Sequence, residues 1–224
     1  TSKMSATLAH EIKNPIAGIR SGIQLLKDRA AKEGDKMLCE SMIKEIDRVT
    51  ALIMNLFTLS VKKESPKEQI CFKKVIGEIA MIYSKGPEGQ KVIMETEVEE
   101  DLTGYLNENE FRQIAHNLIS NSIKSIPFGT EGRLKITGKS SDNRALIEFQ
   151  DNGKGMSREE LSQAMEPFYT KSINGIGIGL AIVKKLVEQN GGTLEMASAC
   201  GEGTCVRLTF YRREEDYEEN ISRG

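Results

Sequence analysis

The sequence predicts an α+β fold in two parts, a helical hairpin followed by a mixed α/β domain. Three observations support this prediction. Apolar residues recur at three- and four-residue steps through residues 2–62, which is the spacing of helices with one apolar face. Ser65-Pro66 then interrupts the pattern as a linker would. Beyond it, short stretches of strand character alternate with helical segments.

The first part is expected to contain a helix over about residues 2–30, a polar turn over 31–35 and a second helix ending near residue 62. Two helices alone bury one stripe each and leave apolar surface exposed to water. Hairpins of this kind cover that surface by pairing into a four-helix bundle. We therefore predict a homodimer through residues 2–62, with packing against the second half of the same chain as the alternative.

The stretch from His10 to Pro15 stands out in the first helix. A proline inside a helix loses its own hydrogen bond and crowds the carbonyl of Glu11, which costs about 3 kcal/mol. Either the helix kinks there, or it begins at Asn14-Pro15 with the proline in its first turn. A lone histidine such as His10 on an amphipathic helix is usually only a surface or boundary residue.

The second part is expected to alternate strands and helices. Strands are predicted near residues 69–72, 91–98, 105, 133–139, 144–150, 193–199 and 204–211, and helices over about 74–83, 108–125, 158–165 and 179–190. An acidic segment ends the chain and is expected to be a frayed tail. The predicted organisation is a hairpin over 1–62, a linker over 63–67, an α/β domain over 68–213 and a tail over 214–224.

Composition excludes several classes of function. The net charge of −2 over 224 residues gives no reason to expect nucleic acid or a membrane surface as partner. No apolar run reaches the roughly 18 residues that a membrane span needs. The four cysteines lack metal-site spacing and are read as reduced thiols of a cytosolic protein. The chain opens in helical sequence without a cap, which suggests a piece of a longer protein.

One helix of the second part carries a polar row. Asn117, Asn121 and Lys124 are four and seven positions apart, so they share one helix face. Two carboxamides supply oxygen ligands for a hard cation such as Mg²⁺, and the ammonium supplies a point charge for phosphate. A solvated polar face would explain the same row.

Asp151 follows an apolar strand pattern and begins the sequence Asp-Asn-Gly-Lys-Gly. A carboxylate buried at a strand end can accept a hydrogen bond from an exocyclic amine. Gly153 and Gly155 would let the backbone approach a flat ligand closely. The same sequence is also a good turn.

Three alternating glycines, Gly175, Gly177 and Gly179, lead through Leu180 into a strong helical pattern. Because glycine costs roughly 1 kcal/mol against alanine inside a helix, they indicate a loop shaped for backbone donors. Free N–H groups and the helix dipole favour phosphate at such a helix start. The spacing does not fit a Rossmann motif, and a flexible lid without a ligand is the alternative.

Together these stretches resemble the sensor histidine kinases of two-component systems. The matching boxes, in the family's order, are the phosphoacceptor box with His-Glu-Ile-Lys-Asn-Pro intact at 10–15, the N box at 117–124, the first glycine box at 151–155, the F box at 166–171, the second glycine box at 175–180 and the last glycine box at 201–204. The resemblance spans about residues 4–211. Within the family, the sequence is most similar to the NtrB-like branch.

The resemblance implies the GHKL (Bergerat-type) α/β sandwich, an ATP-binding fold shared with Hsp90, MutL and type II topoisomerases. It implies that Asp151 reads the adenine amine with Thr204 nearby, and that Asn121, supported by Asn117, holds Mg²⁺ against the phosphates of ATP. Lys124 would neutralise phosphate charge, and Lys171 would approach the γ-phosphate. Gly177 and Gly179 would let the lid close.

On the acceptor side the resemblance implies that His10 is phosphorylated, with Glu11 as the base. It assigns to Asn14 the orientation of water when the kinase dephosphorylates its partner. The expected partner is the receiver domain of a response regulator, which takes the phosphoryl group on an aspartate. Two alternatives remain: an ATPase or serine kinase on the same sandwich, and a dimeric scaffold that docks a receiver while its nucleotide site is idle.

Overall fold

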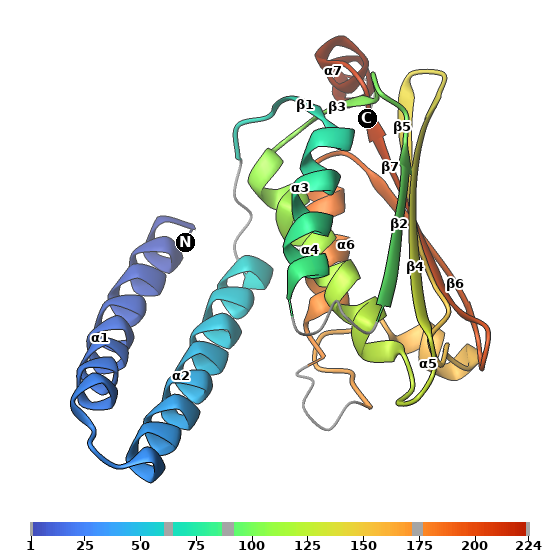
Figure 1. Ribbon diagram of the computed structural model, residues 1–224. Helices are drawn as coiled ribbons and strands as arrows, with labels where there is room; N and C mark the ends of the chain where they lie inside the picture. Colours follow the sequence, from blue (N-terminus) through green and yellow to red (C-terminus); the bar gives the residue numbers. More distant parts are fainter. Residues whose placement is uncertain (1, 61–64, 87–91, 172–176, 223–224) are drawn as a thin grey trace. The chain divides into compact units, whose positions relative to one another are not determined.

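The computed structural model describes residues 2–60, 65–86, 92–171 and 177–222, and only the backbone of residues 2–11 and 219–222. The chain forms two compact units, residues 1–63 and residues 64–224. Figure 1 shows a helical hairpin in the first unit and a sheet covered by helices in the second. Each unit is described by itself below.

The first unit consists of helices α1 (Ser2–Arg29) and α2 (Glu33–Ser60). Helix α1 runs unbroken through Pro15, so the alternative of a helix that begins at Asn14-Pro15 is wrong. Ion pairs join the two helices, at 2.7 Å for both Arg20–Asp47 and Lys27–Glu40.

Most of the apolar stripe of this hairpin stays exposed in the single chain. No residue of α2 is buried, and Ile23 is the one buried apolar residue of α1 among those whose side chains are described. Large apolar side chains on both helices are more than a third exposed: Ile19, Leu25, Leu26, Met37, Leu38, Met42, Val49, Met54 and Leu56.

The second unit is built on a mixed five-stranded sheet of order β2-β4-β5-β7-β6. The strands are β2 (Val92–Val98), β4 (Gly132–Ser141), β5 (Arg144–Asp151), β6 (Thr193–Ala199) and β7 (Gly203–Tyr211). Only β2 and β4 pair in parallel; the other neighbours are antiparallel. Strands β1 (Glu68–Cys71) and β3 (Thr103–Leu106) form a separate antiparallel pair.

Helices α3 (Phe72–Lys85), α4 (Glu108–Ser125) and α6 (Gly179–Gln189) cover one face of the sheet (Figure 1). Phe72, Phe111 and Phe210 meet in the core between them, with ring centroids 4.9 to 6.0 Å apart. The opposite sheet face carries charged side chains paired across strands, such as Arg207 with Glu148 at 2.7 Å. Buried residues alternate with more exposed ones over residues 132–139 of β4 and along β5, as expected for strands with one face toward the core.

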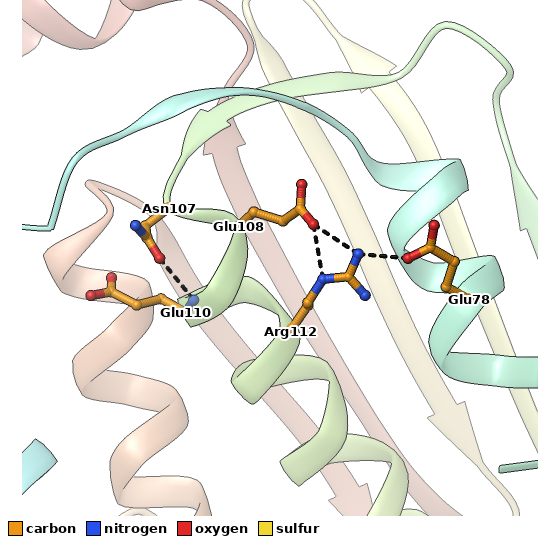
Figure 2. A network of polar contacts seen from close by, with 5 residues as sticks. All are labelled: Glu78, Asn107, Glu108, Glu110 and Arg112. Carbon is orange, nitrogen blue, oxygen red and sulfur yellow. Dashed lines mark hydrogen bonds and ion pairs between the residues drawn. The ribbon is translucent and has the colours of Figure 1, made fainter. Parts of the chain in front are cut away.

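The start of α4 is held by a polar network (Figure 2). Asn107 caps the helix, because its side chain accepts a hydrogen bond from the N–H of Glu110 at 3.0 Å. Arg112 bonds Glu108 one turn earlier at 2.7 Å and Glu78 of α3 at 2.6 Å. These bonds fix the first turn of α4 and join it to α3.

The same helix start is tied to α6 and to two residues of the predicted linker. Asn190, at the end of α6, accepts a hydrogen bond from Asn107 N at 2.8 Å and donates one to Glu110 at 2.7 Å. Ser65 donates to Glu110 at 2.5 Å, and Asn107 donates to the carbonyl of Pro66 at 2.7 Å. Five residues from three segments thus share one network.

The expectation of a frayed acidic tail is wrong. Residues Glu214–Ser222 form helix α7. Tyr217 anchors it, with its ring centroid 5.7 Å from that of Tyr105 and 6.1 Å from that of Tyr211. The Nζ of Lys67 lies 4.8 Å from the centroid of the same ring. One aromatic side chain packed against the domain orders a segment whose charge alone suggested fraying.

Candidate active site

The second unit contains a cavity of about 150 Å³. The end of α4, the end of β5, the loop after it, the start of α6 and strands β6 and β7 contribute to it. The lining residues are Leu118, Asn121, Ser122, Ser125, Phe149, Asp151, Lys154, Gly155, Met156, Leu180, Met196, Thr204 and Val206. Apolar walls with a few polar groups at fixed places suit a flat, mostly apolar ligand that carries a polar edge.

Asp151 is the buried polar group of this cavity, with 7% of its surface exposed. It is the last residue of β5, as the strand pattern predicted. Its Oδ1 atom accepts hydrogen bonds from Gly153 N at 2.9 Å, Ser125 Oγ at 3.2 Å and Thr204 N at 3.3 Å. The carboxylate is therefore held in one orientation by the loop after β5, by the end of α4 and by β7.

The glycines after Asp151 serve the protein's own packing. A Cβ on Gly153 would overlap the Ser125 hydroxyl, and a Cβ on Gly155 would overlap the carbonyl of Ala199. Gly155 also has a φ of +64°, which favours glycine. These contacts are between parts of the chain, so packing within the unit already accounts for both glycines. The role predicted for them toward a flat ligand stays a prediction, and Gly155 lines the cavity.

The polar row of α4 meets the start of α6. A Cβ on Gly179 would lie 3.6 Å from the side-chain nitrogen of Asn121 and 3.9 Å from the side-chain oxygen of Asn117. Helix α6 begins there without a side-chain cap, so its first N–H groups and the two carboxamides face the same place. Lys124 lies one turn further along α4 and is exposed.

The side-chain nitrogen of Asn117 is buried and has no hydrogen-bond partner among the described residues. A buried donor without a partner is costly, and such atoms are usually satisfied by water or a ligand. The carboxamide oxygens of Asn117 and Asn121 are hard donors that fit Mg²⁺, and the free N–H groups of α6 fit phosphate oxygens. The residues present thus fit a magnesium–phosphate group.

The lid region is described in part. Lys171 forms an ion pair with Glu160 at 2.7 Å. That bond, followed by a backbone hydrogen bond from Ser157, lowers the pKa of Glu160 to about 2. Gly177 has a φ of +72° and packs against the backbone of Tyr169. Gly175, the first predicted glycine of this stretch, lies outside the described residues.

The predicted acceptor residues lie on α1. His10 and Glu11 belong to this helix, but their side chains lie outside the described part of the chain. Asn14, one turn after His10, is exposed. The structure therefore places these three residues on one helix of the first unit.

Several cavity residues were not predicted. Met156 and Met196 line the cavity, although neither is among the predicted site residues. Ser122 and Ser125 lie on the N-box helix; Ser125 is four positions after Asn121, a spacing that could have indicated the same face, whereas Ser122 directly follows Asn121 and gave no such signal. Met196 had no such signal, because the pairing of β6 with β7 brings it to the site.

None of the helices among the described residues is both long enough and apolar enough to cross a membrane. No three side chains of His, Cys, Asp or Glu gather as metal ligands in the described parts of the chain.

Comparison with known families gives two matches. Residues 1–64 match the His Kinase A (phospho-acceptor) domain, and residues 106–214 match the histidine kinase-, DNA gyrase B- and HSP90-like ATPase family. The curated relatives include sporulation kinase D of Bacillus subtilis, 32% identical over 92% of this chain and 41% of the relative. Sporulation kinase B of the same organism is 28% identical over 92% of this chain and 49% of the relative. The sensor histidine kinase ZraS of Escherichia coli is 28% identical over 92% of this chain and 44% of the relative.

The chain thus spans half or less of the length of these relatives. Among solved structures, full-length ShkA in complex with AMPPNP has a TM-score of 0.81 at 21% identity, covering 94% of this chain and 46% of that one. ThkA in complex with the response regulator TrrA has a TM-score of 0.67 at 22% identity, covering 96% of this chain and 62% of that one. These likenesses confirm the predicted fold, a helical hairpin followed by a GHKL-type sandwich.

The phospho-acceptor and ATPase matches lie on the two units in the order that the motifs predicted. The chain belongs to the sensor histidine kinases of two-component systems.

Proposed function

We propose that the chain binds ATP and Mg²⁺ in its second unit, phosphorylates itself on His10 and passes the phosphoryl group to an aspartate of a response-regulator receiver domain. The observation that carries this proposal is the set of groups in the cavity lining: a buried carboxylate, Asp151, together with Asn121, which lies beside the uncapped start of α6. The carboxylate suits an adenine, and the helix start suits phosphates.

In this reaction Asp151 would accept a hydrogen bond from the adenine amine, while Met156 and Met196 would pack against the faces of the base. Asn121 and Asn117 would hold Mg²⁺, which neutralises charge on the phosphates. Phosphoryl transfer needs chiefly in-line positioning and charge stabilisation, so this set of residues is sufficient for the nucleotide side.

The acceptor chemistry requires a neutral imidazole. A neutral imidazole carries a lone pair on one ring nitrogen, and that nitrogen is the nucleophile. That nitrogen would attack the γ-phosphorus, a P–N bond would form as the bond to the ADP oxygen breaks, and Glu11 would accept the ring proton. Asn14 would orient water in the reverse sense, when the protein dephosphorylates its partner.

Lys171 and Lys124 would add positive charge near the phosphates. Lys171 is paired with Glu160. If Lys171 moves to the γ-phosphate, it exchanges the carboxylate of Glu160 for the phosphate as its anionic partner. Gly177 and Gly179 would allow the backbone around the start of α6 to close over the nucleotide, and Lys124 lies exposed one turn beyond Asn121.

We also propose that the first unit forms a homodimer through residues 2–62. The apolar side chains that the hairpin leaves exposed support it, because pairing into a four-helix bundle would cover them. Size-exclusion chromatography with light scattering tests this, and a clean monomer at micromolar concentration would contradict it.

The four cysteines are unpaired, which suits the cytoplasm.

The decisive experiment is incubation with radiolabelled ATP and Mg²⁺, with the wild type beside His10→Gln and Asp151→Asn. We expect an acid-labile, base-stable label in the wild type that both variants lose, since one removes the acceptor and the other the base-reading group. A label that persists in His10→Gln would support a serine kinase instead. No nucleotide binding at all would support a scaffold that docks a receiver domain.

A further inference from the structure

A serine outside the six boxes contacts a hydroxyl of a residue that lines the cavity. Ser198 lies on β6 and is paired in register with Thr204 of β7. Its Oγ atom accepts a hydrogen bond from Met156 N at 2.9 Å, donates one to Gly203 O at 2.8 Å and lies 2.9 Å from the hydroxyl of Thr204. Thr204 lines the cavity, whereas Ser198 lies behind it.

The protons of these groups can be assigned by counting. A serine hydroxyl has one proton and two acceptor positions. The Met156 N–H can only donate and the Gly203 carbonyl can only accept, so the Ser198 proton goes to that carbonyl. Gly203 is buried, and a buried carbonyl deprived of this bond would be destabilising. The hydrogen bond between Ser198 and Thr204 must then be donated by Thr204.

Thr204 consequently keeps only lone pairs for the cavity. The neighbouring Asp151 is restricted in the same way, because it is paired in register with Thr204 and all its hydrogen bonds from the described residues end on Oδ1. Its second oxygen, Oδ2, remains for a ligand, and an ionised carboxylate only accepts. The cavity therefore presents two neighbouring acceptors.

Two acceptors side by side distinguish between purines. An exocyclic 6-amino group carries two N–H donors and can satisfy both, directly or through one water. A 6-oxo group carries lone pairs and would face two acceptors, which leaves it unpaired.

We propose that Ser198 is a positioning residue that fixes Thr204 as an acceptor, so that the site selects 6-amino over 6-oxo purine nucleotides. This inference rests on the proposed function, since it requires that the cavity binds a nucleotide. Without the Ser198 hydroxyl, the Thr204 proton turns freely and can be donated to a 6-oxo group.

The test is a comparison of Mg-ADP with Mg-IDP binding to the whole chain by calorimetry. The diphosphates differ at the purine ring and cannot donate a γ-phosphate, so no turnover interferes. The wild type should prefer ADP, and Ser198→Ala should lower the ratio of the two affinities about tenfold, the effect of one hydrogen bond lost or gained. A loss of folded protein affects both nucleotides equally, so the ratio reports orientation alone.

Two further variants complete the design. Ser198→Thr keeps the hydroxyl and should restore the wild-type ratio. Ser162→Ala removes another hydroxyl that donates to a backbone carbonyl, that of Glu159 at 2.7 Å, and should leave the ratio unchanged because it lies on α5 (Arg158–Gln163), outside the cavity lining.

An unchanged ratio in Ser198→Ala, with both nucleotides still bound, would overturn the inference. Failure of the wild type to bind either nucleotide would instead overturn the proposed function. If Ser198→Ala does not fold, Thr204→Val decides: loss of ADP affinity with IDP affinity retained supports the inference, and equal loss of both contradicts it.

Discussion

Replacing Asn190 by alanine should destabilise the second unit strongly. This side chain is 1% exposed and closes the end of α6. It accepts a hydrogen bond from Asn107 N at 2.8 Å and donates to Leu186 O at 2.8 Å and to Glu110 at 2.7 Å. Alanine would remove all three bonds and leave a backbone N–H and a carboxylate oxygen without these partners.

The magnitude follows from the type of each bond. A neutral hydrogen bond contributes about 1 kcal/mol, and one to a charged group about 1.5–3 kcal/mol. Glu110 is half-buried and keeps its bond from Ser65, so water and that serine recover part of the loss. We expect a loss of about 3 kcal/mol in the free energy of unfolding, which lowers the melting temperature by about 6–12 °C for a unit of this size.

Urea unfolding followed by circular dichroism measures the change, and Gln189→Ala is the matched control. Gln189 is the preceding residue of α6, and its side-chain nitrogen is buried without a partner among the described residues. Its truncation should change the free energy of unfolding by less than about 1 kcal/mol. If Asn190→Ala is no more destabilising than this control, the network does not stabilise the unit as reasoned.

Three other predictions concern single groups. Gly155→Ala should lower the free energy of unfolding by at least about 2 kcal/mol and weaken nucleotide binding. The reason is that the φ of Gly155 is +64° and a Cβ there would overlap the carbonyl of Ala199. A stable variant that binds nucleotide normally would contradict this packing argument. The hydrogen bond to Glu214 raises the pKa of Tyr105 to about 12, so the stabilisation from this pair is present below pH 10.0 and is lost between pH 10.0 and pH 12. In an absorbance titration, Glu214→Gln should lower the pKa of Tyr105. An unchanged pKa would show that Glu214 does not cause the shift. Since the pKa of Glu160 is lowered to about 2, its ion pair with Lys171 stabilises the fold above pH 4.5, and this stabilisation is lost as the pH falls towards 2. Urea titrations should show that the difference in unfolding free energy between the wild type and Glu160→Gln shrinks over that range. A constant difference would contradict the ion pair.

Local patterns predicted those parts of the fold that local physics determines. Helix α4 was predicted with the bounds observed, Glu108–Ser125, because a capping asparagine and an apolar stripe define it. Asp151 was placed at a strand end by the alternation before it. In both cases the deciding interactions lie within a few residues of each other.

Features that depend on distant pairing could not be predicted in this way. Met196 reaches the cavity, and Ser198 reaches Thr204, only because β6 pairs with β7. Gly155 is required by the carbonyl of Ala199, far along the chain. The order of α7 depends on Tyr217 finding a surface made of several segments. No periodicity in the sequence encodes such contacts.

Helices α4 and α6 are antiparallel: Asn107 is hydrogen-bonded to Asn190 at one extremity, and Asn121 lies beside Gly179 at the other. The chain enters this unit at the first extremity, where Ser65 is bonded to Glu110. About 21 Å of α4 separates Asn107 from Asn121, at 1.5 Å per residue. Under the proposed function, one stiff helix would therefore connect the point where the chain enters the unit with the residues that hold the phosphates.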